Sequence, residues 1–197
     1  MARRSDHSRE QIKNMAIAEA EKIIVAEGPA ALSARRVTQA IGYSVGSLYL
    51  VFDNLDDLIA HVNRRTVNGL FEAMQQAGEG NAKPLTRLKR MGRAYADYSR
   101  EHPNRLRLAF EHPYPAATPG QNDRSGEQLV GLVVAPLAEA SGLSGKKLET
   151  AAQVLWSGVH GICILALTEK MARVGSQTRV ELLTDSLIEN YIGGLKA

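Results

Sequence analysis

Residues 32–58, LSARRVTQAIGYSVGSLYLVFDNLDDL, decide the fold that we predict for this chain. Two short helices are expected in this stretch, one after Ser33 and one after Ser44, because serine favours the position before a helix start. Gly42 lies between them, where a tight turn needs a residue without a side chain. Two short helices joined by such a turn have the geometry of a helix-turn-helix.

The apolar spacing in this stretch predicts a small core. Val37, Ala40 and Ile41 are expected to face inward from the first short helix, and Leu48 from the second. The second helix is too short to be stable alone, so it must pack on its neighbours. On spacing alone, a plain three-helix packing unit with a glycine turn remains an alternative to a DNA-binding motif.

Small hydroxyl residues at the start of the second helix suit DNA, because they allow close approach to phosphates and can bond to base edges. A tyrosine one turn further on can reach a phosphate, and arginines nearby can neutralise the backbone. The predicted DNA-binding residues are Ser33, Arg35, Arg36, Tyr43, Ser44, Val45, Gly46, Ser47 and Tyr49, with Arg3 and Arg4 of the N-terminal arm.

The remainder of the chain is predicted to be helical, so the fold class is all-α. Ser8 with Gln11 forms a predicted capping box, and the first helix is expected to end at Gly28. Further helices are expected over residues 55–77, 84–101, 104–111, 127–140, 146–170 and 178–195. Proline- or glycine-containing loops are expected at 78–83 and 112–125.

Composition excludes several classes of protein. The 197 residues are 44% hydrophobic and 23% charged, which is ordinary globular usage and excludes a disordered, collagen-like or purely coiled-coil chain. The single cysteine excludes an internal disulfide and fits a reducing cytoplasm. The start of the chain has no apolar stretch typical of a secretory signal. We therefore expect a cytoplasmic protein.

One segment requires a membrane test. Residues 150–168 contain no formal charge, and their length approaches the ~20 residues of a bilayer span. Gln153 and Ser157 within the segment, and Glu149 and Glu169 at its borders, favour instead a helix that is buried inside protein on several sides. No membrane association is expected.

The second half of the chain combines aromatic and polar tips in a pattern that suits a small organic ligand. The predicted ligand-binding residues are Met91, Tyr95, Tyr98, Phe110, Trp156, His160 and Cys163. Core residues with satisfied polar tips are the alternative for each of them. His160 and Cys163 could also bind a metal, but no third ligand is evident nearby, so no metal or cofactor is expected.

Charge is unevenly distributed. The net charge is +3, yet residues 83–107 alone contain eight Lys or Arg and two Asp or Glu. We interpret this stretch as a solvated face, with an anionic effector as the alternative.

The last helix has a wide apolar stripe that predicts a symmetric dimer interface formed by Val180, Leu183, Leu187 and Tyr191.

These motifs together resemble the TetR/AcrR family of bacterial transcription regulators. The matching residues are Glu27-Gly28, Leu32-Ser33, Val37, Ile41-Gly42, Ser44, Gly46-Ser47-Leu48-Tyr49, Phe52 and Leu58. The resemblance implies a three-helix DNA-binding domain over 1–54, a connector helix over 55–77, and a ligand-binding and dimerisation domain over 78–197. Trp156 with His160-Gly161 resembles one subgroup, defined by a Trp…His-Gly element.

Two departures from the family pattern bear on DNA binding. Leu50 and Val51 replace residues that are often aromatic, basic or histidine, and Leu55 replaces a frequent lysine.

The expected function is a ligand-responsive regulator, by family default a repressor, that a small molecule releases from a pseudo-palindromic operator. The alternative is a helical ligand-binding or adaptor protein with weak or lost DNA binding. No catalytic motif is present, so an enzyme is not expected.

Overall fold

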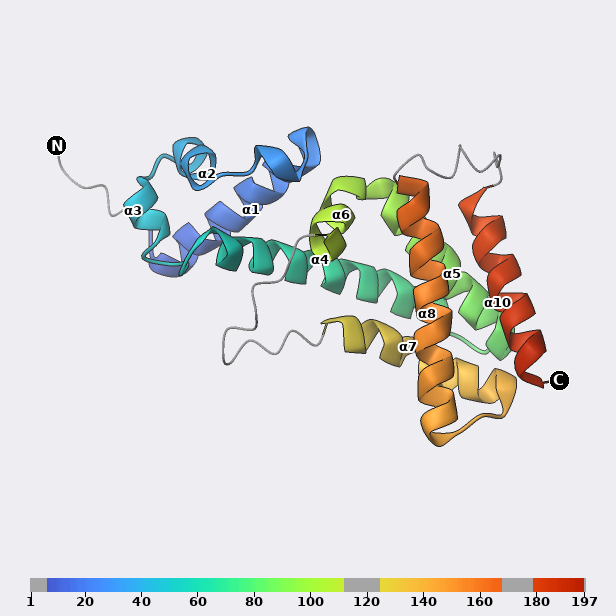
Figure 1. The fold of residues 1–197 in the computed structure, drawn as a ribbon. Helices are drawn as coiled ribbons and strands as arrows, with labels where there is room; N and C mark the ends of the chain where they lie inside the picture. Colours follow the sequence, from blue (N-terminus) through green and yellow to red (C-terminus); the bar gives the residue numbers. More distant parts are fainter. Residues whose placement is uncertain (1–6, 112–124, 168–178, 197) are drawn as a thin grey trace. The chain divides into compact units, whose positions relative to one another are not determined.

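The computed structural model describes residues 7–111, 125–167 and 179–196, and within them every regular element is helical (Figure 1). The elements are α1 (Arg9–Glu27), the 3₁₀ turn η1 (Pro29–Ala31), α2 (Ala34–Ile41), α3 (Val45–Leu48), α4 (Leu55–Gly78), α5 (Pro84–Glu101), α6 (Pro103–Glu111), α7 (Ser125–Ser141), α8 (Gly145–Leu167) and α10 (Val180–Lys196). The all-α class and the predicted order of helices are confirmed.

The chain forms two compact units. The first contains the described residues of Met1–Thr66 and Asn104–Gln121, and the second contains those of Val67–Pro103 and Asn122–Ala197. Helix α4 therefore contributes to both units, and α6 belongs to the first. These units are defined by compactness alone. The functional domain ranges 1–54 and 78–197 therefore stay a prediction.

Local capping sets the helix starts, as predicted. The Ser8 hydroxyl accepts a 3.2 Å bond from the Gln11 N–H, and the Gln11 side chain accepts a 2.7 Å bond from the Ser8 N–H. Ser33 and Ser44 likewise accept bonds from the N–H groups three residues further on, at 3.3 and 3.1 Å. Gly42 ends α2 with φ +77°, a left-handed conformation that favours glycine.

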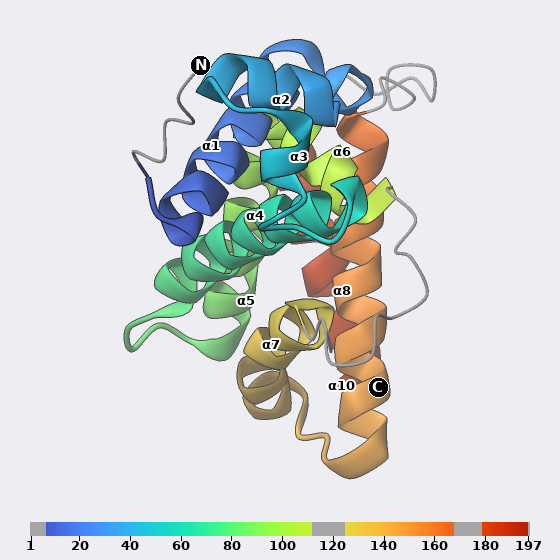
Figure 2. The same ribbon diagram turned by 90° about the vertical axis from the view of Figure 1, so that its left-hand side faces the viewer.

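The core of the first unit lies between α1, α2, α3 and the start of α4, with Leu108 of α6 packed against it (Figure 2). Val37 and Leu48 are fully buried, as predicted. The prediction for Ala40 is wrong, because Ala40 is exposed and Thr38 is buried in its place. At 100° per residue, the inward arc of α2 extends from Val37 through Ile41 to Thr38, whose hydroxyl donates a 2.9 Å bond to the Ala34 carbonyl.

The second unit is a helical bundle in which α5 contacts α7, α8 and α10. Among the described helices, α8 alone is long and apolar enough to cross a membrane by length and composition. Of its most apolar 18 residues, 28% are buried inside the protein. The expected burial on several sides is met where α8 faces α5, α7 and α10. It is not met at Val154 and Leu165, which are about half exposed.

Candidate nucleic-acid interface and ligand site

Helix α3 is held by one buried side chain and exposes the residues around it. Leu48 is 1% exposed, whereas Val45 is 36% and Tyr49 46% exposed. Ser44 and Gly46 are also exposed, while Ser47 is half-buried and its hydroxyl lies 2.9 Å from that of Ser44. Five of the residues predicted to contact DNA, Ser44, Val45, Gly46, Ser47 and Tyr49, therefore lie together on one short helix and its two caps, which Leu48 anchors from behind.

Leu50 is the most exposed large apolar side chain near α3, at 62%. It is one of the two positions at which this sequence departs from the polar family pattern. A leucine at this position carries an apolar side chain that can neither donate nor accept a hydrogen bond.

Tyr43, in the turn before α3, has a partner that the sequence did not indicate. Its hydroxyl lies 2.8 Å from His7 Nδ1, and the two rings meet edge to face with centroids 6.1 Å apart. The contact joins residues 36 positions apart, so no local pattern could predict it. His7, two residues before the first residue of α1, therefore positions Tyr43. Arg3 and Arg4 lie outside the described residues.

The two adjacent arginines of α2 differ in their surroundings. Arg35 is exposed, whereas Arg36 donates a 2.9 Å bond to Glu27 and a 3.2 Å bond to the Ala31 carbonyl. A second guanidinium nitrogen of Arg36 also bonds to Glu27, so the pair is bidentate. The hydrogen bond from Arg36 lowers the pKa of Glu27. Arg36 thus connects α2 to the end of α1.

The second unit contains a partly enclosed apolar cavity of about 20 Å³, roughly the room that one water needs. Its walls come from α4, α5, α7, α8 and α10. Three predicted ligand-binding residues, Met91, Tyr95 and Trp156, line it together with Val133, Leu155 and Ile188.

His160 and Cys163 lie beside this cavity without lining it. The Tyr95 hydroxyl is 2.6 Å from His160 Nδ1, and the His160 ring stacks on Trp156 at 4.8 Å between centroids. Burial lowers the pKa of His160, raises that of Tyr95 and raises the pKa of the Cys163 thiol to about 12. The group is therefore uncharged at neutral pH.

The other two predicted ligand-binding residues lie elsewhere. Tyr98 stacks edge to face on His102, with ring centroids 4.5 Å apart, and its hydroxyl lies close to Gly69. Phe110 is half-buried on α6, in the first unit. Neither lines the cavity described above.

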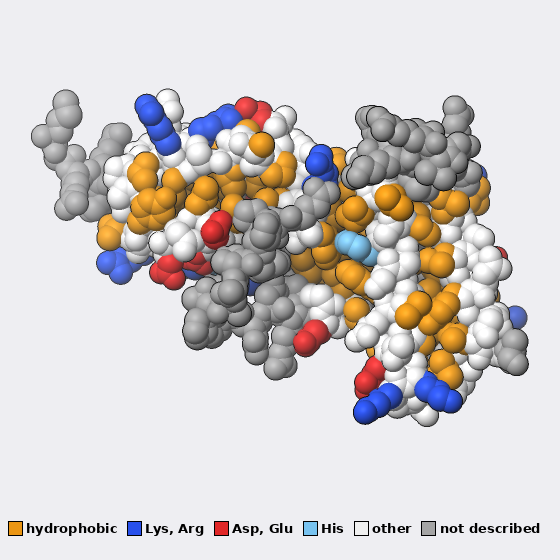
Figure 3. All heavy atoms as spheres, in the orientation of Figure 1, with side chains coloured by type: hydrophobic (Ala, Val, Ile, Leu, Met, Phe, Trp, Pro, Cys, Tyr) orange, Lys and Arg blue, Asp and Glu red, His pale blue; other side chains and the backbone are white. Residues whose placement is uncertain are grey.

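The four residues predicted for the dimer interface are all half-buried within the single chain. Leu187 packs on Gly158 of α8, and burial raises the pKa of Tyr191. More exposed apolar side chains lie nearby, namely Leu182 of α10 and Val154 and Leu165 of α8. Hydrophobic side chains follow α8 and α10 on the face drawn in Figure 3.

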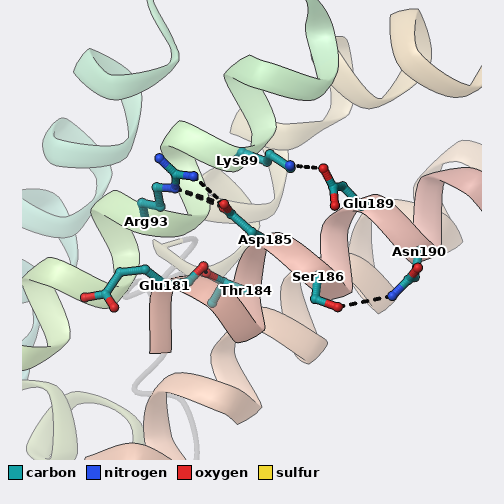
Figure 4. A network of polar contacts seen from close by, with 8 residues as sticks. All are labelled: Lys89, Arg93, Glu181, Thr184, Asp185, Ser186, Glu189 and Asn190. Atoms are coloured by element: carbon teal, nitrogen blue, oxygen red, sulfur yellow. Dashed lines mark hydrogen bonds and ion pairs between the residues drawn. The ribbon is translucent and has the colours of Figure 1, made fainter. Parts of the chain in front are cut away.

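The basic stretch 83–107 is paired with acids from other helices. Arg93 and Lys89 of α5 bond to Asp185 and Glu189 of α10 (Figure 4), and Arg100 bonds to Glu181 at 2.9 Å. Ion pairs therefore offset part of the sequence-derived excess of +6. Among the described residues, no group of three or more His, Cys, Asp or Glu could hold a metal ion.

An exposed short helix after a glycine turn, a long following helix and a separate helical bundle define the class of helix-turn-helix transcription regulators. Residues 16–62 match the family model "Bacterial regulatory proteins, tetR family", and residues 88–191 match "Tetracyclin repressor-like, C-terminal domain". The chain belongs to the TetR family, and it is a DNA-binding transcriptional regulator rather than an enzyme.

Individual relatives agree with this assignment. The HTH-type transcriptional regulator Rv0681 of Mycobacterium tuberculosis is 30% identical over 87% of this chain and 75% of its own length. A solved protein of unknown function from Rhodococcus sp. RHA1 shares the fold over 100% of both chains, with a TM-score of 0.78 and 20% identity. The TetR family regulator PfmR from Thermus thermophilus gives a TM-score of 0.65 at 19% identity over 92% of this chain and 99% of its own.

Proposed function

We propose that this protein is a homodimeric repressor that binds a pseudo-palindromic operator and is released from it by a small molecule. The observation that carries the proposal is the exposure of Val45 and Tyr49 on either side of the buried Leu48. A helix anchored in this way keeps its outer face free for the major groove. The protein is proposed to act in the cytoplasm, with no membrane association.

The proposed DNA contacts divide into two kinds. Tyr43, Tyr49 and Arg35 are proposed to bind phosphates, which would fix the position of the protein on the duplex. Ser44, Val45, Gly46 and Ser47 are proposed to face the bases. Ser33 and Arg36 remain in the proposed interface as supports, because Ser33 caps α2 and Arg36 is bonded to Glu27. Arg3 and Arg4 are proposed to add contacts from the arm.

The proposed dimer forms through α8 and α10 of each chain. The stripe of Val180, Leu183, Leu187 and Tyr191 is widened by the exposed Leu182, Val154 and Leu165. Two-fold symmetry about these helices would bury the face of α8 that the single chain leaves open. It would also present two α3 helices to successive major grooves, which is why the proposed operator is pseudo-palindromic.

The proposed effector binds in the second unit, at the cavity lined by Met91, Tyr95 and Trp156 and beside His160 and Cys163. The cavity is lined in part by Met74 of α4, the helix that also belongs to the first unit. A ligand that enlarges the cavity would move α4 and change the separation of the two α3 helices, which lowers DNA affinity.

The proposal is tested by gel shift and footprinting on DNA upstream of the protein's own gene, with random DNA of equal length as competitor. The wild type should protect a two-fold symmetric site. Tyr49→Ala should lose at least tenfold in specific affinity while sedimenting as a dimer. Leu182→Asp with Val154→Asp should give monomers that bind DNA weakly. Binding to upstream DNA no tighter than to random DNA would refute the proposal.

A further inference from the structure

Trp156 borders two different spaces in the second unit. One is the small apolar cavity beside Tyr95, and the other is an open groove of about 800 Å³ between α7 and α8. The indole is part of the wall of both. Trp156 is only partly buried, so part of its surface is open to solvent.

The groove has an acidic chemical character. Glu127 near the start of α7 and Glu149 near the start of α8 line it, together with the polar side chains of Gln153 and Ser157. Among the described residues that line the groove, none is Lys or Arg. Figure 3 shows acidic side chains near the start of α7 and at the lower end of α8, where Lys or Arg side chains lie beside them. A group bound against this described lining meets two carboxylates, while Lys146 and Lys147 at the start of α8 lie outside it, so the lining favours a positive charge.

The cavity on the other side of Trp156 has the opposite preference. Its described lining is aliphatic and aromatic apart from the Tyr95 hydroxyl, and that hydroxyl is already bonded to His160. No charged side chain reaches it. An anion here would lose its hydration without gaining a partner, which is costly, whereas an apolar group gains from burial.

The present cavity is too small for an organic ligand, so binding must enlarge it. The α7 side of the groove is open, because a Cβ added at Gly126 or Gly131 would meet nothing within 4 Å. Movement of the Trp156 indole toward this open side would join the cavity to the groove. A single elongated site would result, apolar at its inner end and acidic at its outer end.

We infer that the effector is an amphipathic cation whose apolar part enters the cavity past Trp156 and whose positive group lies in the groove beside Glu127 and Glu149. The inference rests on the proposed function only in taking this space as the effector site. It adds the chemical class of the ligand and the direction of entry. Trp156 acts as the movable wall between the two ends.

The chain offers a direct readout because Trp156 is its single tryptophan. Three probes share one apolar cage and are transparent at the wavelengths that excite tryptophan: 1-adamantanemethylamine, 1-adamantanemethanol and 1-adamantaneacetate. Each is titrated into the full-length protein while Trp156 fluorescence is recorded. The amine should bind about fivefold tighter than the alcohol, the ratio expected from two exposed ion pairs, and the carboxylate should bind weakest.

Matched variants assign the preference to the groove. Glu127→Gln with Glu149→Gln should lower the affinity for the amine to that for the alcohol and leave the alcohol unchanged. Glu72→Gln, which removes an exposed carboxylate on α4 away from the groove, should change neither. Equal affinity for amine and carboxylate, an amine preference that survives the double variant, or binding of none of the probes would each overturn the inference.

A gel shift on the same samples without probe keeps the two proposals apart. Specific DNA binding combined with a failed ranking of the probes would refute the ligand class and leave the proposed function standing. The expected ranking without specific DNA binding would refute the proposed function and support the ligand class.

Discussion

Arg93 in α5 donates bonds from Nε to both carboxylate oxygens of Asp185 in α10, at 3.0 and 3.2 Å, across 92 positions of sequence. Asp185 is 8% exposed, so the guanidinium is what compensates this buried carboxylate. Lys89 with Glu189 and Arg100 with Glu181 extend the same contact along the two helices. The basic stretch of α5 therefore fastens α10 to the bundle.

Charge reversal of this pair gives the first prediction. Arg93→Asp should destabilise the protein by about 1 to 2 kcal/mol, because it places a second carboxylate beside Asp185. The loss of stability is small because the Arg93 side chain is about half exposed and water screens its charge. Adding Asp185→Arg should recover part of the loss, as measured by urea unfolding of both single variants and the double. Simple additivity of the two substitutions would contradict a direct pairing.

The second prediction separates Arg35 from Arg36. Arg35→Ala should weaken DNA binding and reduce the slope of log affinity against log salt by about one, since one phosphate contact is lost. Arg36→Ala should lower the melting temperature and weaken DNA binding with a smaller change in slope, because Arg36 is bonded to Glu27 and Ala31. Fluorescence anisotropy at several salt concentrations measures both.

Glu27→Gln is the control for that comparison. It removes the same ion pair while leaving Arg36 in place, so it should reproduce the melting shift and the weaker DNA binding of Arg36→Ala. Tighter DNA binding by Glu27→Gln would show instead that Arg36, once released, contacts phosphate directly.

Features with local causes could be predicted from the sequence. The caps at Ser8, Ser33 and Ser44 and the turn at Gly42 depend on residues within four positions, and the structure confirms them. The error at Ala40 has a local cause too, since Thr38 reaches the core by bonding its hydroxyl within its own helix. An apolar count underrates such a residue.

Features formed by residues far apart in the sequence could be predicted only one helix at a time. The spacing of Met91 and Tyr95 indicated one wall of the cavity, and Trp156 indicated another, because each wall depends on one helix face. The acidic groove required knowing that α7 lies beside α8, which brings Glu127 and Glu149 to one space. The pairing of His7 with Tyr43 depends in the same way on tertiary structure.

The third prediction concerns two glycines at helix contacts. A Cβ at Gly92 would lie 2.8 Å from Cδ1 of Ile188, and one at Gly158 would lie 2.7 Å from Cδ2 of Leu187. Ile188 is 1% exposed and cannot move aside, whereas Leu187 is half-exposed and can. Gly92→Ala should therefore cost about 1 to 2 kcal/mol of unfolding free energy, after the gain in helix propensity.

Gly158→Ala should cost less than about 0.5 kcal/mol, because the helix propensity gain offsets a small shift of Leu187. Urea unfolding of both variants at one protein concentration gives the comparison. Equal costs at the two sites would mean that the freedom of the neighbouring side chain does not decide the outcome.

The last prediction concerns pH and His160. Burial lowers the pKa of His160 below the ordinary histidine pKa of about 6.5. Just below that pH, His160 is therefore protonated in the unfolded chain and stays neutral in the folded chain. Stability should therefore be complete above that pH and fall as the solution is acidified toward the folded pKa. His160→Gln should show a smaller drop in melting temperature between pH 7.5 and 5.5 than the wild type. The pKa of His61 is also lowered by burial, so some pH dependence should remain and should diminish in a variant that also carries His61→Gln.

If His160→Gln loses as much melting temperature between pH 7.5 and 5.5 as the wild type does, the ring beside Tyr95 is not the group whose protonation weakens the fold.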